Sequence, residues 1–196
     1  MNVKNLIGVV LLLCIASAGA QTADTVDSKY EGYLLAEVLE SVSARIGKSI
    51  FLDPQVKQHD RVVVFGKSVT ELEFADMLRI LDLHGYTAYE VDDALNVVKE
   101  NSVRSDSLPT FMEGQSYEPL QYVSKVVALN KLCAAQALPI LRPLVARNAH
   151  LTAMTQGNSL IMVDKYANIQ RVENIIKELD NSIDKKQKCE PLPKKS

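Results

Sequence analysis

The features that would mark an enzyme or a nucleic-acid-binding protein are scarce in this sequence. It has three histidines, and His59, His84 and His150 lie far apart without a metal-ligand spacing such as H-E-x-x-H. It has no G-x-S-x-G motif and no phosphate-binding glycine loop. Its 22 Lys+Arg against 24 Asp+Glu lack the basic excess that releases phosphate counterions. We therefore expect no enzyme activity, no cofactor, no metal ion and no nucleic-acid partner.

Outside its first twenty residues, the sequence also lacks an apolar run long enough to span a membrane. The first twenty residues combine Lys4, an apolar run over 6–15 and small residues that end in an A-x-A pattern at Ala18 and Ala20. This pattern predicts a secretory signal peptide that is cleaved before Gln21. We therefore expect the mature chain to be exported, with only indirect contact with a membrane.

Cysteine is equally sparse, because only Cys133 and Cys189 remain after such a cleavage. In an oxidising compartment the two could form one disulfide between the middle of the chain and its tail. In the alternative interpretation, Cys133 is a small core residue and Cys189 is a thiol of the tail. The sequence leaves both open.

Composition and hydrophobic periodicity divide the chain into two small α+β domains. The predicted parts are a signal peptide over 1–20, a short leader over 21–29, a first domain over 30–99, a linker over 100–120, a second domain over 121–182 and a charged tail over 183–196. The linker is rich in Ser, Pro and Gly and has few aliphatic residues, so we expect it to bury little. The lysines of the tail predict a solvated end or, alternatively, contact with anionic lipid or an acidic partner.

In the first domain, apolar residues recur at helical spacing from Leu35 to Ile46, and the following Gly47 predicts a helix end. Two strands over 49–52 and 61–65 follow, and then a second helix that begins at a Thr70–Glu73 capping box. A hairpin over 86–91 and 95–99 closes the domain. The predicted order is helix-strand-strand-helix-strand-strand, and a short preceding strand near Tyr30 is left open.

The second domain is predicted as strand-helix-strand-strand-helix, over 123–129, 132–145, 150–155, 159–163 and 168–179. Pro139 lies within the first of these helices, where it should kink or divide the helix unless it falls in the first turn. In each domain we expect a short mixed sheet packed by two helices.

Five short segments of the two predicted domains carry a recognisable pattern: Asp53–Lys57, Val62–Val64, Leu81–Tyr86, Leu141–Val145 and Asn158–Asp164. In these segments the chain resembles the first and second N-terminal periplasmic domains of secretins, most closely those of the type II secretion system. The resemblance covers about residues 30 to 182. It departs from the family pattern at Gln58-His59, where a glycine turn is usual, and at Ala94, which replaces a glycine.

The resemblance implies a periplasmic protein-binding module, associated with an outer-membrane secretin complex, whose first domain docks an inner-membrane secretion assembly protein. It also allows binding to full-length secretin subunits and assembly as a homo-oligomer. A complete secretin would continue with further periplasmic domains and an outer-membrane barrel, which this sequence lacks. We therefore expect no pore of its own, and a truncated or split secretin is an alternative.

An exposed strand edge in the first domain is the predicted docking element, because free backbone groups can pair with a partner's strand. The candidate residues are Tyr33, Arg61, Val62 and Val64. The competing interpretation is that Val62 and Val64, as alternating valines, simply face the core.

Two other classes share part of the predicted architecture. The N-terminal signalling module of TonB-dependent transducers resembles the first domain and leaves the second unexplained. A KH-like nucleic-acid module shares the element order of the second domain, but it needs a GXXG clamp, and the turns over 147–149 and 156–158 carry none.

Overall fold

The computed structural model describes residues 32–184 and Cys189. The predicted cleavage residues Ala18, Ala20 and Gln21 lie outside these residues. The elements are β1 (Tyr33–Leu34), α1 (Leu35–Ile46), β2 (Ile50–Leu52), β3 (Arg61–Val62), α2 (Phe74–Leu83), β4 (Tyr86–Val91), β5 (Ala94–Lys99), β6 (Tyr122–Ala128), α3 (Ala134–Leu141), β7 (His150–Met154), β8 (Ser159–Lys165) and α4 (Tyr166–Asn181), with short 3-10 turns between some of them. This order confirms the predicted α+β class.

Helix α1 forms where the apolar periodicity predicts it. Leu35, Val38, Leu39 and Val42 follow the i, i+3, i+4, i+7 spacing, and all four are buried in the first hydrophobic core. The helix ends at Gly47, which adopts φ 68° and donates its N–H to the carbonyl of Ser43 at 3.0 Å. Glycine takes up this left-handed conformation without a steric penalty, so it stops the helix as the sequence indicates.

The first half of the described chain contains two separate sheets. Strands β2, β5 and β4 form a mixed three-stranded sheet in which β2 and β5 are parallel and β4 and β5 form an antiparallel hairpin. Strands β1 and β3 form a two-stranded antiparallel sheet by themselves. The predicted strand over 61–65 is therefore shorter than expected, because β1 offers only two residues for pairing before α1 begins at Leu35.

The start of α2 differs from the predicted capping box. The N–H of Ser68 donates to Glu71 Oε2 at 2.8 Å, which caps a 3-10 turn over Val69–Glu71. The helix itself starts at Phe74, where the N–H of Glu73 donates to Asp76 Oδ2 at 3.1 Å. Glu71 and Asp76 each accept a hydrogen bond from the backbone N–H three residues earlier, so the segment offers two possible helix starts. The capping-box motif alone therefore did not predict at which of them the α-helix begins.

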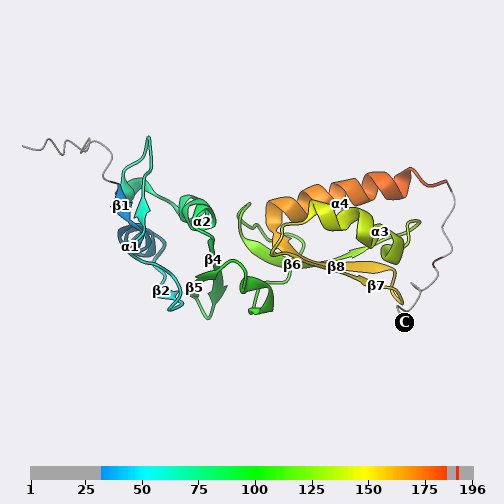
Figure 1. The fold of residues 1–196 in the computed structure, drawn as a ribbon, viewed down its shortest axis with the longest axis horizontal. Coiled ribbons are helices and arrows are strands. Elements are labelled where there is room, and N and C mark those ends of the chain that lie inside the picture. The colour runs from blue at the N-terminus through cyan, green and yellow to red at the C-terminus, as the bar shows by residue number, and fades with distance from the viewer. Residues whose placement is uncertain (1–31, 185–188, 190–196) are drawn as a thin grey trace, which may run out of the picture. The chain divides into compact units, whose positions relative to one another are not determined.

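In the second half, β6, β8 and β7 form an antiparallel sheet with β8 in the centre. Helices α3 and α4 cover one face of this sheet (Figure 1). Helix α3 is shorter than predicted: Pro139 lies beyond its first turn, and after Leu141 the chain continues as a 3-10 turn over Arg142–Leu144. Because proline lacks an N–H and crowds the preceding turn, a helix that contains it ends early.

Apolar side chains gather into two main cores and a small third one. The first core lies among α1, α2 and their strands, and the second lies between α3, α4 and their sheet. The third consists of Val103, Tyr122 and Val163, with Leu108 packed against them. Contrary to expectation, the predicted linker over 100–120 thus contributes buried residues, since Val103 is fully buried. Within residues 32–184, no helix has both the length and the apolar character that crossing a bilayer requires.

Candidate functional site

The predicted docking residues lie on or beside the two-stranded sheet β1–β3. Tyr33 pairs with Val62 and Leu34 pairs with Arg61, in antiparallel register. The ladder continues past the strand ends, because the N–H of Leu35 donates to the carbonyl of Asp60 at 2.9 Å. Since the sheet has only two strands, both of them are edge strands.

The side chains of the candidate residues are not equally accessible. Val62 is buried in the first core, and Tyr33 and Val64 are partly buried and pack against it. Arg61 is exposed, and so is Val63, with 47% of its surface accessible. Val62 is therefore a core residue and Val64 flanks the core, and a partner at this site would meet the backbone edge and the exposed side chains.

Gly32, which directly precedes β1, allows the backbone to lie close to β3. It adopts φ 63°, and a Cβ atom at this position would lie 2.6 Å from the carbonyl oxygen of Val62. Any other residue would therefore push β1 away from β3, in addition to the strain of a left-handed backbone. No motif marks this glycine; the one signal in the sequence is its place directly before the strand.

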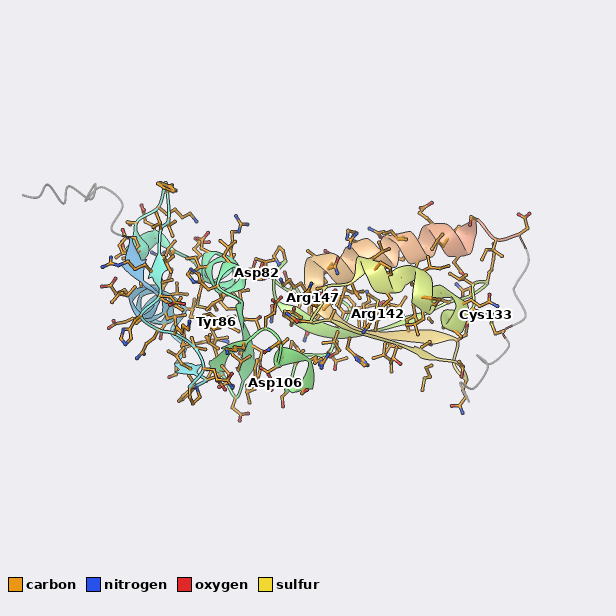
Figure 2. All side chains as sticks on the ribbon, viewed as in Figure 1. Asp82, Tyr86, Asp106, Cys133, Arg142 and Arg147 are labelled. Carbon is orange, nitrogen blue, oxygen red and sulfur yellow. A yellow bond between two sulfur atoms is a disulfide. The ribbon has the colours of Figure 1, made fainter. Side chains whose placement is uncertain are left out.

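A polar cluster centred on Glu100 joins residues from distant parts of the chain. Glu100 Oε1 accepts a hydrogen bond from the Tyr122 hydroxyl at 2.7 Å and lies 2.9 Å from Lys165 Nζ. Glu100 Oε2 accepts from the Asn148 amide at 3.1 Å. Lys165 Nζ also forms an ion pair with Asp82 on α2, which Figure 2 labels. The cluster is largely sheltered, since the Lys165 and Glu100 side chains are only 20% and 17% exposed.

The contacts in this cluster shift three pKa values. Burial alone would raise the pKa of Glu100, but Lys165 and Tyr122 outweigh it, so this pKa lies below its ordinary value. Burial alone would lower the pKa of Lys165, but the two carboxylates raise it. Burial and the bond to Glu100 raise the pKa of Tyr122. At neutral pH the Lys165 ammonium therefore faces the Glu100 carboxylate beside a neutral Tyr122 phenol. The contacts of the cluster connect α2 and the residue after β5 to the β6–β8 sheet.

Cys133 and Cys189 form a disulfide in the structure, with their Cα atoms 5.4 Å apart. Cys133, labelled in Figure 2, directly precedes α3 and is buried, so it is also a core residue. The bond closes a loop with a sequence separation of 56, which contains α3, β7, β8 and α4. It therefore ties Cys189 to the residue that precedes α3.

The histidines do not converge. His84 Nδ1 lies 3.8 Å from Asp60 Oδ2, a contact between the end of α2 and the turn before β3. Across residues 32–184 and Cys189, no group of three or more His, Cys, Asp or Glu side chains is placed to hold a metal ion.

Comparisons with known proteins agree with this fold. Residues 124–185, which begin within β6 and include α3, β7, β8 and α4, match the Secretin_N model, described as the bacterial type II/III secretion system short domain. The chain is similar to secretin N-terminal domains. Secretin XcpQ of Pseudomonas aeruginosa is 26% identical over 146 residues, which cover 74% of this chain and 21% of that protein. Secretin PulD of Klebsiella pneumoniae is 24% identical over 174 residues, which cover 87% and 26%.

A solved structure shares the secretin-like fold. The Klebsiella pneumoniae type II secretion system outer membrane complex, which contains PulD, PulS and the PulC HR domain, aligns over 80% of this chain and 27% of the matched chain. Its TM-score is 0.65 and its sequence identity is 23%. This chain thus spans about a quarter of the length of the relatives that it matches.

Proposed function

We propose that this protein is a periplasmic docking module of a type II-like secretion apparatus, and that its β1–β3 sheet receives a strand of an inner-membrane assembly component. In this proposal the chain binds other proteins of the apparatus, including secretin subunits, and performs no chemistry. The signal peptide predicted over residues 1–20 would deliver it to the periplasm.

The observation that carries the proposal is the separation of β1–β3 from the three-stranded sheet. A third strand could add to this short sheet without displacing any strand of the mixed sheet, because the two sheets share no pairing. Gly32 holds β1 tightly against β3, and the neighbouring Val63 offers an exposed apolar side chain. A pre-organised edge of this kind lowers the ordering cost of binding.

The similarity to secretins supports the identity of the partner. The Klebsiella pneumoniae complex places PulD together with the HR domain of PulC. We extend that association to the first half of this chain, which the alignment includes because it covers 80% of the residues.

Site-specific photocrosslinking in periplasm-containing cells would test the proposal. A photoreactive amino acid would replace Val63, beside β3, and in a matched control it would replace the exposed Asn174 on α4. We expect an adduct with an inner-membrane secretion assembly protein from position 63, and none with that protein from position 174.

The variant Gly32→Ala gives the second arm of this experiment. It should weaken the adduct from position 63 while the chain still folds, because the change acts on the β1–β3 pairing. Adducts only with a TonB-dependent transducer would contradict the proposal and favour the signalling alternative. Equal adducts from both positions would remove β1–β3 as the docking site.

A further inference from the structure

The outer edge of β6 presents a second surface, remote in sequence from β1–β3. Strand β6 lies at one end of its sheet, and Lys125 and Val127 pair with Met162 and Leu160 of β8. In an antiparallel ladder, alternate residues direct their backbone N–H and C=O groups toward the partner strand and away from it. The backbone N–H and C=O of Ser124 both bond to the segment 109–111, away from β8. The backbone N–H and C=O groups of Val126 and Ala128, two and four residues further along, therefore also point away from β8.

The protein itself adds a short strand to the beginning of this edge. The N–H of Ser124 donates to the carbonyl of Pro109 at 2.9 Å, and the N–H of Phe111 donates to the carbonyl of Ser124 at 2.7 Å. Thr110 and Ser124 form a parallel bridge. The chain then leaves the edge, since the N–H of Met112 donates to the Tyr117 hydroxyl at 3.2 Å. The β6 edge therefore accepts an extended segment, and its own segment occupies only the position of Ser124.

Beyond Ser124 the edge is open. Among the described residues, the outward N–H and C=O groups of Val126 and Ala128 have no hydrogen-bond partner. The Val126 side chain is 60% exposed, so it is available to a residue of an added strand. Such an edge is a template for pairing with another chain unless charge, proline or a bulge blocks it, and the open stretch 126–128 contains no charged residue and no proline.

A groove of about 510 Å³ runs between this edge and α4. Phe111 forms its wall where the chain's own strand ends, and Ile176 of α4 lines it together with Val126. The Phe111 ring is held in place, because it stacks on Tyr166 with centroids 6.0 Å apart and lies 3.9 Å from Lys125 Nζ. The groove thus combines open backbone groups with the fixed aromatic wall of Phe111 and a lining that also carries the charged residues Glu113, Lys125, Glu173, Lys177 and Asp180.

We propose that the β6 edge beyond Ser124 binds an extended segment of another polypeptide, which continues the sheet from the point where Pro109–Phe111 leaves it. The arrangement of the open backbone groups indicates what kind of molecule binds here. They recur at every second residue along β6, and an extended peptide presents its own N–H and C=O groups at the same spacing. An apolar side chain of this segment would cover Val126. This surface is independent of the docking at β1–β3.

A second copy of this chain fits the edge less well. The open stretch covers three residues before β6 ends at Ala128, so pairing of β6 with β6 would join two copies through only a few backbone hydrogen bonds. A single extended peptide can pair with the backbone of Val126 and Ala128 and also enter the groove. The geometry therefore favours a peptide over a folded copy.

Selection of peptides on the purified, disulfide-bonded chain would test the proposal. The probe is a displayed library of random peptides of about ten residues, and the best binder would be synthesised and titrated against the wild type and three variants. Val126→Pro and Ala128→Pro each remove one outward N–H without touching a hydrogen bond to β8, and Val126→Ala keeps the N–H as the matched control. We expect each proline variant to bind the peptide about tenfold more weakly or worse, and Val126→Ala to change binding much less.

Amide hydrogen exchange supplies a readout that general destabilisation would not reproduce. Peptide binding should slow the exchange of the Val126 and Ala128 amides, while the Lys125 and Val127 amides, already paired with β8, change little. Circular dichroism would verify that the proline variants fold.

Failure to select a binder, equal binding by the proline variants, or unprotected Val126 and Ala128 amides would each overturn the proposal. Concentration-dependent dimers that Val126→Pro dissociates would also overturn it, in favour of a second copy. None of these results bears on the crosslinks from position 63.

Discussion

Replacement of Asp180 should show how strongly one carboxylate on α4 stabilises the second core. Asp180 is 8% exposed, and it accepts hydrogen bonds from three successive backbone N–H groups in the turn before α3. Oδ1 accepts from Lys131 at 2.7 Å and from Leu132 at 2.6 Å, and Oδ2 accepts from Asn130 at 3.2 Å. The carboxylate therefore holds this turn against the end of α4.

The cost of Asp180→Ala follows from what becomes of each donor. The N–H of Leu132, a residue that is 7% exposed, would be left unpaired in the core, which costs about 1–3 kcal/mol. The N–H groups of Lys131 and Asn130 belong to more accessible residues and can turn to water, so their loss adds about 1 kcal/mol together. We expect the free energy of unfolding to fall by about 2–4 kcal/mol.

Urea unfolding at pH 7 and pH 3 would measure this effect for the wild type, Asp180→Ala and the exposed-site control Glu178→Ala. Burial alone would raise the pKa of Asp180, but the three N–H groups outweigh it and lower this pKa. Because the folded state has the lower pKa, the contribution of Asp180 is complete above the unfolded-state pKa and is lost as the pH falls through the folded-state value. The difference between wild type and Asp180→Ala should thus be smaller at pH 3. A loss at pH 7 no greater than that of Glu178→Ala would refute the reasoning.

Three further predictions concern other parts of the chain. Gly32→Ala should lower the free energy of unfolding by about 1–3 kcal/mol, because its Cβ would meet the carbonyl of Val62 in a left-handed backbone; chemical denaturation measures the loss. Cys133→Ser should destabilise the oxidised protein by about 4 kcal/mol on the loop-entropy model, since the disulfide closes a separation of 56. Lys165→Met should cost about 1–3 kcal/mol, because it leaves Glu100 and a second carboxylate sheltered without their cation; urea unfolding measures it.

Each of these predictions has a matched comparison. Gly66→Ala also replaces a glycine with positive φ, but nothing lies within 4 Å of its added Cβ, so the steric part of the Gly32 effect should be missing. Under reducing conditions the wild type and Cys133→Ser should become equally stable, and a persistent difference would point to packing. Lys177→Met removes an ammonium that is 63% exposed and should change stability by less than about 1 kcal/mol. A Lys165→Met loss no larger than this would contradict the role of the Glu100 cluster.

Short-range sequence patterns correctly predicted the helices with a single apolar face and the turns that depend on one or two residues. The apolar stripes of α1 and α4, the stop at Gly47 and the hairpin of β4 and β5 all depend on neighbours within a few residues. The resemblance of the sequence to secretin N-terminal domains rested on such segments, and the match to the family model over 124–185 agrees with it.

The sequence by itself determined the α+β class, the order of most elements and their apolar faces, because these follow from backbone periodicity. Only the tertiary structure decided that β3 would end at Val62, that Asp180 would cap a turn 48 to 50 residues away and that Glu100 would meet Lys165. It also decided which part of the β6 edge would be covered by the chain's own segment. These features depend on contacts between distant residues, and side-chain spacing along the sequence carries no information about which distant groups will become neighbours.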